Sequence, residues 1–172
     1  GPVRLGAAGG TDAGPAARRG RSLSVAGTLY LEDLHVGQTF VTGPVTVTTE
    51  AIKAFARDYD PQPFHLDEDA ARDSLFGGLA ASGWHTAALS MRLLVDGLPI
   101  AGGLIGVGGE TTWPRPTRPG DTLTVHIEVL EITPSRSRPD RGMVRTRNET
   151  RNQHGEPVQI SKLGIVVWRR PG

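Results

Sequence analysis

The segment between Ser82 and Gly97 constrains the fold of this chain more than any other. Apolar residues recur there at helical spacing, namely Trp84, Ala87, Ala88, Met91, Leu94 and Val95. Small residues occupy most of the remaining faces, and a helix that is small and apolar nearly all round is mostly buried. Ser82 is a good N-cap and Gly97 a good C′ residue, so we expect a buried helix over residues 83–96.

The second half of the chain predicts β-structure. Residues 104–112, 143–151 and 157–168 are expected strands, and the last two are joined by a loop of hairpin length. A half-buried strand is indicated by apolar residues that alternate with polar ones, namely Leu123, Val125, Ile127 and Val129. One long helix followed by an antiparallel meander of three or four strands is an α+β layout.

Upstream of the buried helix, residues 38–49 predict either a strand pair or one bent strand, interrupted at Gly43-Pro44. Thr49 is the expected N-cap of a helix whose apolar face holds Ile52, Phe55, Ala56 and Tyr59. This helix must end near Asp60, because Pro61 and Pro63 follow and the residue before a proline avoids the α region. A further helical turn is expected over residues 67–74.

Residues 1–28 contain seven glycines and four arginines but few large apolar residues. Such a segment buries too little surface to offset its ordering entropy, so we expect a flexible leader before a single domain over residues 29–172. The initial Gly-Pro-Val is typical of the remnant of a cleaved expression tag.

Composition excludes several classes of function. The chain of 172 residues has no cysteine, which excludes disulfides, cysteine-ligated metal sites and cysteine nucleophiles. Its net charge of +1 argues against a nucleic-acid partner. No apolar run approaches the length of about 18 residues that a membrane span needs, so we expect no membrane contact. Arg18-Arg19 could belong to an export signal, but polar and small residues interrupt the apolar stretch after it, and the default expectation is a cytoplasmic protein.

The residues best suited to chemistry lie in the run Tyr59-Asp60-Pro61-Gln62-Pro63-Phe64-His65. A carboxylate and an imidazole stand five residues apart, and the two prolines favour a stiff loop between them. Such a pair can handle one water molecule, with one group taking a proton and the other delivering one to carbon. The alternative is a surface loop in which Asp60 and His65 are incidental.

A second chemical element is the glycine that opens the buried helix. Gly83 has no side chain to obstruct approach to the free N–H groups and the positive dipole end of the helix. Such donors can stabilise the oxyanion of a thioester enolate. Close packing of the helix start is the alternative explanation for this glycine.

Three motifs together resemble the MaoC-like dehydratase family, the group of (R)-specific enoyl-CoA hydratases. They are the run from Tyr59 to His65, Phe76-Gly77-Gly78-Leu79-Ala80-Ala81-Ser82-Gly83-Trp84, and Arg118-Pro119-Gly120-Asp121-Thr122-Leu123. The resemblance spans roughly residues 30–168. It implies a hot-dog fold, in which an antiparallel sheet wraps around a central helix, and a homodimer.

The resemblance also implies the site. Asp60, Pro63 and His65 match the signature Asp-x-Asn-Pro-x-His, which makes Asp60 and His65 the expected catalytic pair. The backbone N–H of Gly83 is the expected oxyanion donor. The chain departs from the signature at Gln62, where the hydratases have Asn, and at Ser82, where the better-known ones have His.

The expected reaction is the reversible hydration of trans-2-enoyl thioesters of CoA or a carrier protein to (R)-3-hydroxyacyl thioesters. It needs neither a metal nor another cofactor. Besides the catalytic pair and Gly83, the expected substrate-binding residues are Gln62, Pro63, Phe64, Phe76, Gly78, Ser82, Trp84 and Trp113.

Three other functions stay open. A hot-dog thioesterase would share the fold, but its carboxylate usually lies on the central helix, where this chain offers only Asp96 near the end. A non-catalytic acyl-CoA-binding protein would not need both Asp60 and His65. A family member recruited to another addition or elimination in specialised metabolism could use the same groups.

Overall fold

The computed structural model describes residues 27–172 and contains one antiparallel sheet of five strands in the order β1-β3-β4-β5-β2. The strands are β1 (Thr39–Thr46), β2 (Ile105–Thr112), β3 (Thr122–Pro134), β4 (Arg141–Arg151) and β5 (Pro157–Trp168). Strands β3, β4 and β5 form the expected meander, and β1 and β2 are the two edges of the sheet. The expected leader lies almost wholly outside the described residues.

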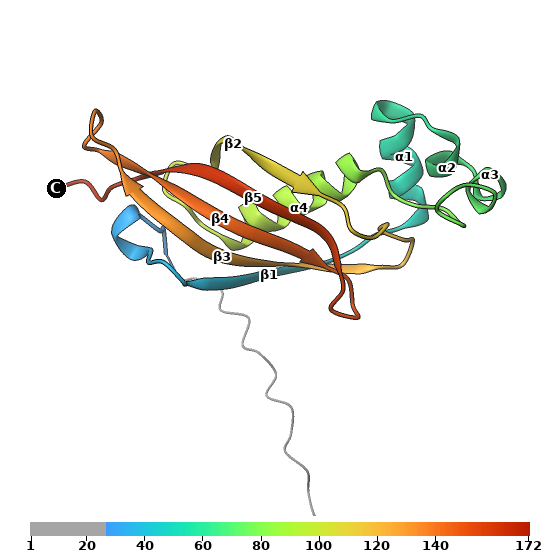
Figure 1. Ribbon diagram of the computed structural model, residues 1–172, viewed down its shortest axis with the longest axis horizontal. Coiled ribbons are helices and arrows are strands. Elements are labelled where there is room, and N and C mark those ends of the chain that lie inside the picture. Colours follow the sequence, from blue (N-terminus) through green and yellow to red (C-terminus); the bar gives the residue numbers. More distant parts are fainter. Residues whose placement is uncertain (1–26) are drawn as a thin grey trace, which may run out of the picture.

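The longest helix, α4 (Gly83–Gly97), lies along one face of the sheet, as Figure 1 shows. The shorter helices α1 (Thr49–Tyr59), α2 (Pro63–Leu66) and α3 (Glu68–Arg72) gather at the end of the molecule where α4 begins. A single 3-10 turn, η1 (Leu31–Asp33), precedes β1. This arrangement confirms the expected α+β class and the antiparallel sheet packed on a central helix.

The core lies between α4 and the sheet. The alternating residues of β3 are fully buried as expected, namely Leu123, Val125, Ile127 and Val129. The inward row of β4 begins with the apolar Val144 and continues with the buried polar residues Thr146, Asn148 and Thr150. The space under α4 is therefore partly polar, which the strand pattern alone did not predict.

The prediction that α4 is mostly buried is wrong for the single chain. Leu93 and Leu94 face the core, whereas Trp84, Met91 and Val95 are exposed. Gly97 is the last helical residue rather than a C′ residue. Its role is close approach, since a Cβ there would lie 2.3 Å from Thr42 Cγ2.

Two helix starts also differ from the sequence prediction. The N-cap of α1 is Thr48, whose hydroxyl accepts from the N–H of Ala51, and Thr49 is the first helical residue. Residues 63–66 form the short helix α2 instead of a loop, because Pro63 occupies its first turn, where a proline is tolerated. Residues 39–46 form one strand, and its pairing with β3 is irregular at Gly43-Pro44.

Candidate active site

A cleft of about 410 Å³ opens at the N-terminal end of α4. Helix α2 and the residue that ends α1 form one side, and the segment between β2 and β3 forms the other. The cleft brings together most of the predicted site residues, namely Asp60, Gln62, Phe64, His65, Phe76, Ser82, Gly83, Trp84 and Trp113.

Asp60 is held at the end of α1, where its backbone N–H donates to the carbonyl of Ala56 at 2.9 Å. One carboxylate oxygen, Oδ1, accepts from Gln62 Nε2 at 2.7 Å. The other, Oδ2, lies 3.4 Å from His65 Nε2. The break that Pro61 imposes after α1 therefore turns this carboxylate toward the imidazole.

His65 lies on α2 and is only 4% exposed. Its Nδ1 is 2.6 Å from the carbonyl oxygen of Ala80, which can only accept a hydrogen bond. Nδ1 therefore carries a proton, and a neutral ring presents the lone pair of Nε2 toward Asp60. The ring is also packed edge to face against Phe64, with centroids 4.6 Å apart.

The surroundings of Asp60 keep it ionised. Burial acts to raise the pKa of this carboxyl, but hydrogen bonds from the Ser82 hydroxyl and the Gln62 amide act against burial, as does the positive charge of the His65 ring when it is protonated, and the pKa of Asp60 is lowered. The same Ser82 oxygen accepts from the N–H of Trp84 at 3.2 Å, which caps α4. Ser82 thus links the catalytic candidate to the helix start.

Gly83 is the first residue of α4 and packs under Trp113. A Cβ at Gly83 would lie 2.9 Å from Trp113 Cε2, so only glycine fits beneath the indole. Trp113 is itself fixed by a hydrogen bond of 2.9 Å from Nε1 to Gln159 Oε1. The N–H of Gly83 has no acceptor among the described residues and lies at the positive end of the α4 dipole.

Two predicted substrate contacts are not in the cleft wall. Pro63 opens α2, and the carbonyl of Gly78 accepts from an Arg118 guanidinium nitrogen at 2.8 Å. Arg118 also donates to the carbonyls of Leu79 and Phe76 and so clamps the loop that leads into α4. Arg118 in this structure holds the loop through backbone carbonyls, a role that its place in the motif did not predict.

The cleft also includes residues that sequence reasoning missed. Thr86 donates to Thr117 Oγ1 at 2.9 Å, which ties α4 to the segment before β3. Ala81 lines the cleft and donates its N–H to the carbonyl of Thr117 at 2.9 Å. Their spacing in the sequence carries no signal, because the contacts join segments more than thirty residues apart.

Arg115 also lines the cleft, whereas His85 and Asp96 lie outside it. His85 stacks on Phe55 with ring centroids 4.8 Å apart, and burial lowers the pKa of His85. Asp96 is exposed and paired with Arg92 at 2.7 Å near the far end of α4. Within residues 27–172, no group of three His, Cys, Asp or Glu side chains could hold a metal ion, and no helix is long and apolar enough to cross a membrane.

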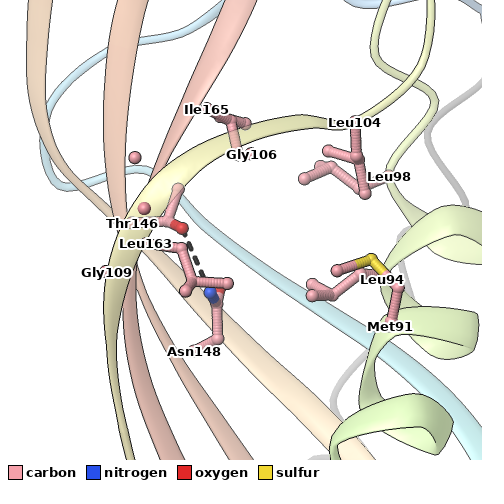
Figure 2. A pocket seen from close by; sticks show the side chains of 12 residues that line it. Met91, Leu94, Leu98, Leu104, Gly106, Gly109, Thr146, Asn148, Leu163 and Ile165 are labelled. Carbon is pink, nitrogen blue, oxygen red and sulfur yellow. Dashed lines mark hydrogen bonds between the residues drawn. The ribbon is translucent and has the colours of Figure 1, made fainter.

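A second cavity of about 230 Å³ lies farther along α4. Met91, Leu94 and Leu98 form its helix side, and Figure 2 shows Leu163, Thr146 and Asn148 opposite them on the sheet. Strand β2 closes it with backbone at Gly106 and Gly108–Gly109. The cleft and this cavity therefore lie along one helix, the first at its N-terminus and the second toward its C-terminus.

Comparison with known proteins identifies the family. The MaoC-like domain matches residues 33–152, which include the cleft and the central helix. This chain belongs to the MaoC-like dehydratase family. The crystal structure of a MaoC-like dehydratase from Rhodospirillum rubrum is 63% identical, with a TM-score of 0.82 over 84% of this chain and 99% of that one. The hot-dog fold expected from the sequence is thereby confirmed.

Two curated relatives carry names that state a reaction. A 3-hydroxybutyryl-CoA dehydratase of Methylorubrum extorquens is 33% identical over 64% of this chain and 69% of its own length. An (R)-specific enoyl-CoA hydratase of Rhodospirillum rubrum is 31% identical over 62% of this chain and 74% of its own length. Both names describe the addition or removal of water at a CoA thioester. Because this chain belongs to the same MaoC-like family, the comparisons support hydration or dehydration of CoA thioesters as its class of reaction.

Proposed function

We propose that this protein catalyses the reversible hydration of trans-2-enoyl thioesters to (R)-3-hydroxyacyl thioesters, with Asp60 and His65 as the catalytic pair. The observation that carries the proposal is the approach of Asp60 Oδ2 to within 3.4 Å of His65 Nε2, while Nδ1 is held by the carbonyl of Ala80. Both facing atoms are hydrogen-bond acceptors when the ring is neutral. A water molecule can therefore donate one hydrogen bond to each.

In this reaction the oxygen of the bound water forms a bond to C3 of the enoyl group. The pair takes up a proton from the water and supplies a proton to C2, so that H and OH are added across one double bond. Dehydration is the same path in reverse. The lowered pKa of Asp60 supports this role, because an ionised carboxylate accepts the hydrogen bond that orients the water.

The N–H of Gly83 is the proposed oxyanion donor. During addition, negative charge develops on the thioester oxygen, and a preorganised N–H at a helix N-terminus stabilises that charge. Trp113 and Trp84, whose rings meet edge to face at 5.5 Å, wall this end of the cleft. The tight fit of Gly83 under Trp113 is a second reason for a glycine at this position.

The second cavity is the proposed place of the acyl chain. Gly83, Ala87, Met91 and Leu94 lie on one side of α4, and eight residues from Gly83 to Met91 correspond to a rise of about 12 Å. An acyl chain whose carbonyl meets the Gly83 N–H can extend along this side into the cavity. Either CoA or a carrier protein could present such a chain.

We further propose that two copies form a homodimer through β2 and α4. The edge strand β2 has one free edge, and apolar residues on it and on α4 are exposed, namely Trp84, Met91, Val95, Ile105 and Val107. An exposed apolar edge of this kind favours pairing with another chain. A second copy offers a matching surface by symmetry.

Hydration of crotonyl-CoA in D₂O tests the proposed reaction. The expected product is (R)-3-hydroxybutyryl-CoA with one deuterium at C2, identified by chiral chromatography and mass spectrometry. Loss of absorbance from the conjugated thioester gives the rate. Release of free CoA, or an (S) product, would contradict the proposal.

A further inference from the structure

The sheet wall of the second cavity contains a buried amide that is only partly hydrogen-bonded. Asn148 lies on the inward row of β4 and is 5% exposed. Its Nδ2 donates to Thr146 Oγ1 at 3.1 Å, as Figure 2 shows. Its Oδ1 is buried and has no hydrogen-bond partner among the described residues. Buried polar atoms in proteins are nearly always paired, so an unpaired one in a cavity wall points to a ligand.

Several buried polar side chains near Asn148 satisfy one another. Ser161, which stands directly opposite Asn148 on β5, is paired with Thr111 at 3.1 Å and accepts from Gln159 at 3.3 Å. Ser90 is paired with Thr150 at 2.6 Å. Two other buried side-chain atoms among the described residues are also unpaired, Thr42 Oγ1 and His85 Nδ1, but neither residue lines the cavity, so Asn148 Oδ1 is the unpaired atom that belongs to its wall.

The composition of the wall argues for a ligand rather than for water. Among the twelve described residues that line the cavity, Thr146 and Asn148 are the only ones with polar side chains. Thr146 already accepts from Asn148. A buried water typically makes about three hydrogen bonds, which this wall does not supply through its side chains. A polar group joined to an apolar chain fits the wall better.

The size of the cavity suits the end of an acyl chain. A protein cavity of about 150 Å³ lined by aliphatic side chains accommodates benzene. At about 230 Å³, this cavity holds a group of about nine heavy atoms by the same measure. Met91, Leu94, Leu98 and Leu163 would contact the methylene groups.

Building on the proposed function, we propose that Asn148 is a specificity-determining residue that selects thioesters whose acyl chain has a hydroxyl group at its distal end. A hydroxyl both donates and accepts, so it pairs with either end of the amide. A carboxylate or an amine at the same place would be a buried charge without a partner of opposite sign, because none of the residues that line the cavity is charged.

Matched pairs of saturated acyl-CoA thioesters test this selection by binding alone. The two members of a pair have equal numbers of heavy atoms and end in a hydroxyl or a methyl group, with chains of six to twelve carbons. Isothermal titration calorimetry is expected to show at least tenfold tighter binding of the hydroxyl member at one chain length or more. Equal or weaker binding of that member at every length would overturn the proposal.

Two variants test whether the Asn148 side chain causes the preference for the hydroxyl member. Asn148→Leu has a similar shape without the polar atoms, and in it the preference should disappear or change to the methyl member. Leu163→Val enlarges the same cavity without touching the amide, so the affinity ratio of a pair should stay within about twofold of wild type. A preference that persists in Asn148→Leu would overturn the role of this residue. If circular dichroism shows that Asn148→Leu does not fold, the relative affinity of wild type for the hydroxyl and methyl thioesters tests the proposal by itself.

Hydration of the corresponding trans-2-enoyl thioesters separates this inference from the proposed function. Hydration of methyl and hydroxyl members at equal kcat/KM, with equal binding, would contradict the role of Asn148 and leave the reaction intact. Selective binding of the hydroxyl member without hydration of any thioester, crotonyl-CoA included, would contradict the reaction and leave the role of Asn148 standing.

Discussion

At the scale of single residues, the lowered pKa of Asp60 depends on three neighbouring side chains, those of Gln62, His65 and Ser82. Gln62 donates to one carboxylate oxygen, His65 faces the other, and the Ser82 hydroxyl reaches it from the start of α4. Their combined effect lowers the pKa of Asp60 against the opposing effect of burial. The carboxylate is therefore preset as an acceptor near neutral pH.

Replacing Gln62 tests how far the lowered pKa of Asp60 depends on the hydrogen bond from the Gln62 amide. In Gln62→Ala the pKa of Asp60 should rise, so the acidic limb of the pH profile of kcat/KM should move to higher pH. Gln62 is exposed, so the fold should be unaffected. The conservative Gln62→Asn keeps an amide and should keep most of the shift. An unmoved limb in Gln62→Ala would show that the amide does not set the charge of Asp60.

The same hydrogen bond has a consequence for stability with a definite sign. Since the folded pKa of Asp60 is lowered, its ionised form stabilises the folded state above the unfolded value of about 3.9. This contribution is lost as the pH falls through the folded pKa. The difference in free energy of unfolding between wild type and Gln62→Ala should thus be present at pH 7 and shrink below pH 4, as denaturant titrations can measure.

Residue identity in the sequence was enough to select Asp60, His65 and Gly83, and the structure brings them to one cleft. It was not enough to select the carbonyl of Ala80, which orients His65, because a backbone group has no residue-specific signal. Gly78 was expected at the substrate, yet its carbonyl binds Arg118. The sequence could not distinguish these roles, since both occur in the same glycine-containing loop.

At the scale of elements, the helix starts show where local patterns are ambiguous. Thr48 and Thr49 are adjacent, and both satisfy the composition of an N-cap, but only Thr48 has extended backbone and a hydroxyl bonded to the Ala51 N–H. Similarly, the prolines after α1 were expected to exclude a helix. Pro63 instead begins one, because the first turn needs no N–H from it.

The N-cap assignment can be measured by paired substitutions. Thr48→Ala should lower the free energy of unfolding by about 1 kcal/mol, because the Ala51 N–H loses its acceptor. Thr49→Ala should cost less than half of this, since Thr49 is already helical. Urea denaturation of the two variants gives the comparison. An equal or larger loss in Thr49→Ala would contradict the assignment.

At the scale of the whole molecule, the β3-β4-β5 meander and the central helix match the expectation, but the order of the whole sheet and the exposure of α4 do not follow from the strand pattern. Strand β2 pairs with β5 rather than with β3, so a four-stranded meander does not form. The apolar pattern of α4 predicts a mostly buried helix, whereas Trp84, Met91 and Val95 are exposed. A pattern of apolar residues predicts burial without saying whether the chain itself or a second copy provides the cover. The homodimer proposed above reconciles the pattern with the structure.

Sedimentation tests this proposal. The wild type should have close to twice the chain mass of 18.3 kDa. Met91→Lys places a charge on the exposed side of α4 and should shift the equilibrium toward the monomer, whereas Glu110→Lys alters the charge of β2 without removing an apolar side chain and should have a smaller effect. A wild type that stays monomeric at concentrations of tens of micromolar would contradict the proposal.

Asp60 is proposed to act in the chemistry of hydration, and one comparison of rates tests this role. Crotonyl-CoA hydration is measured for wild type, Asp60→Asn and the matched control Asp58→Asn, which changes an exposed carboxylate of α1 two residues before Asp60. We predict a loss in kcat of at least a thousandfold in Asp60→Asn with an intact fold, and a rate within about twofold of wild type in Asp58→Asn. An Asp60→Asn variant as active as wild type would contradict it.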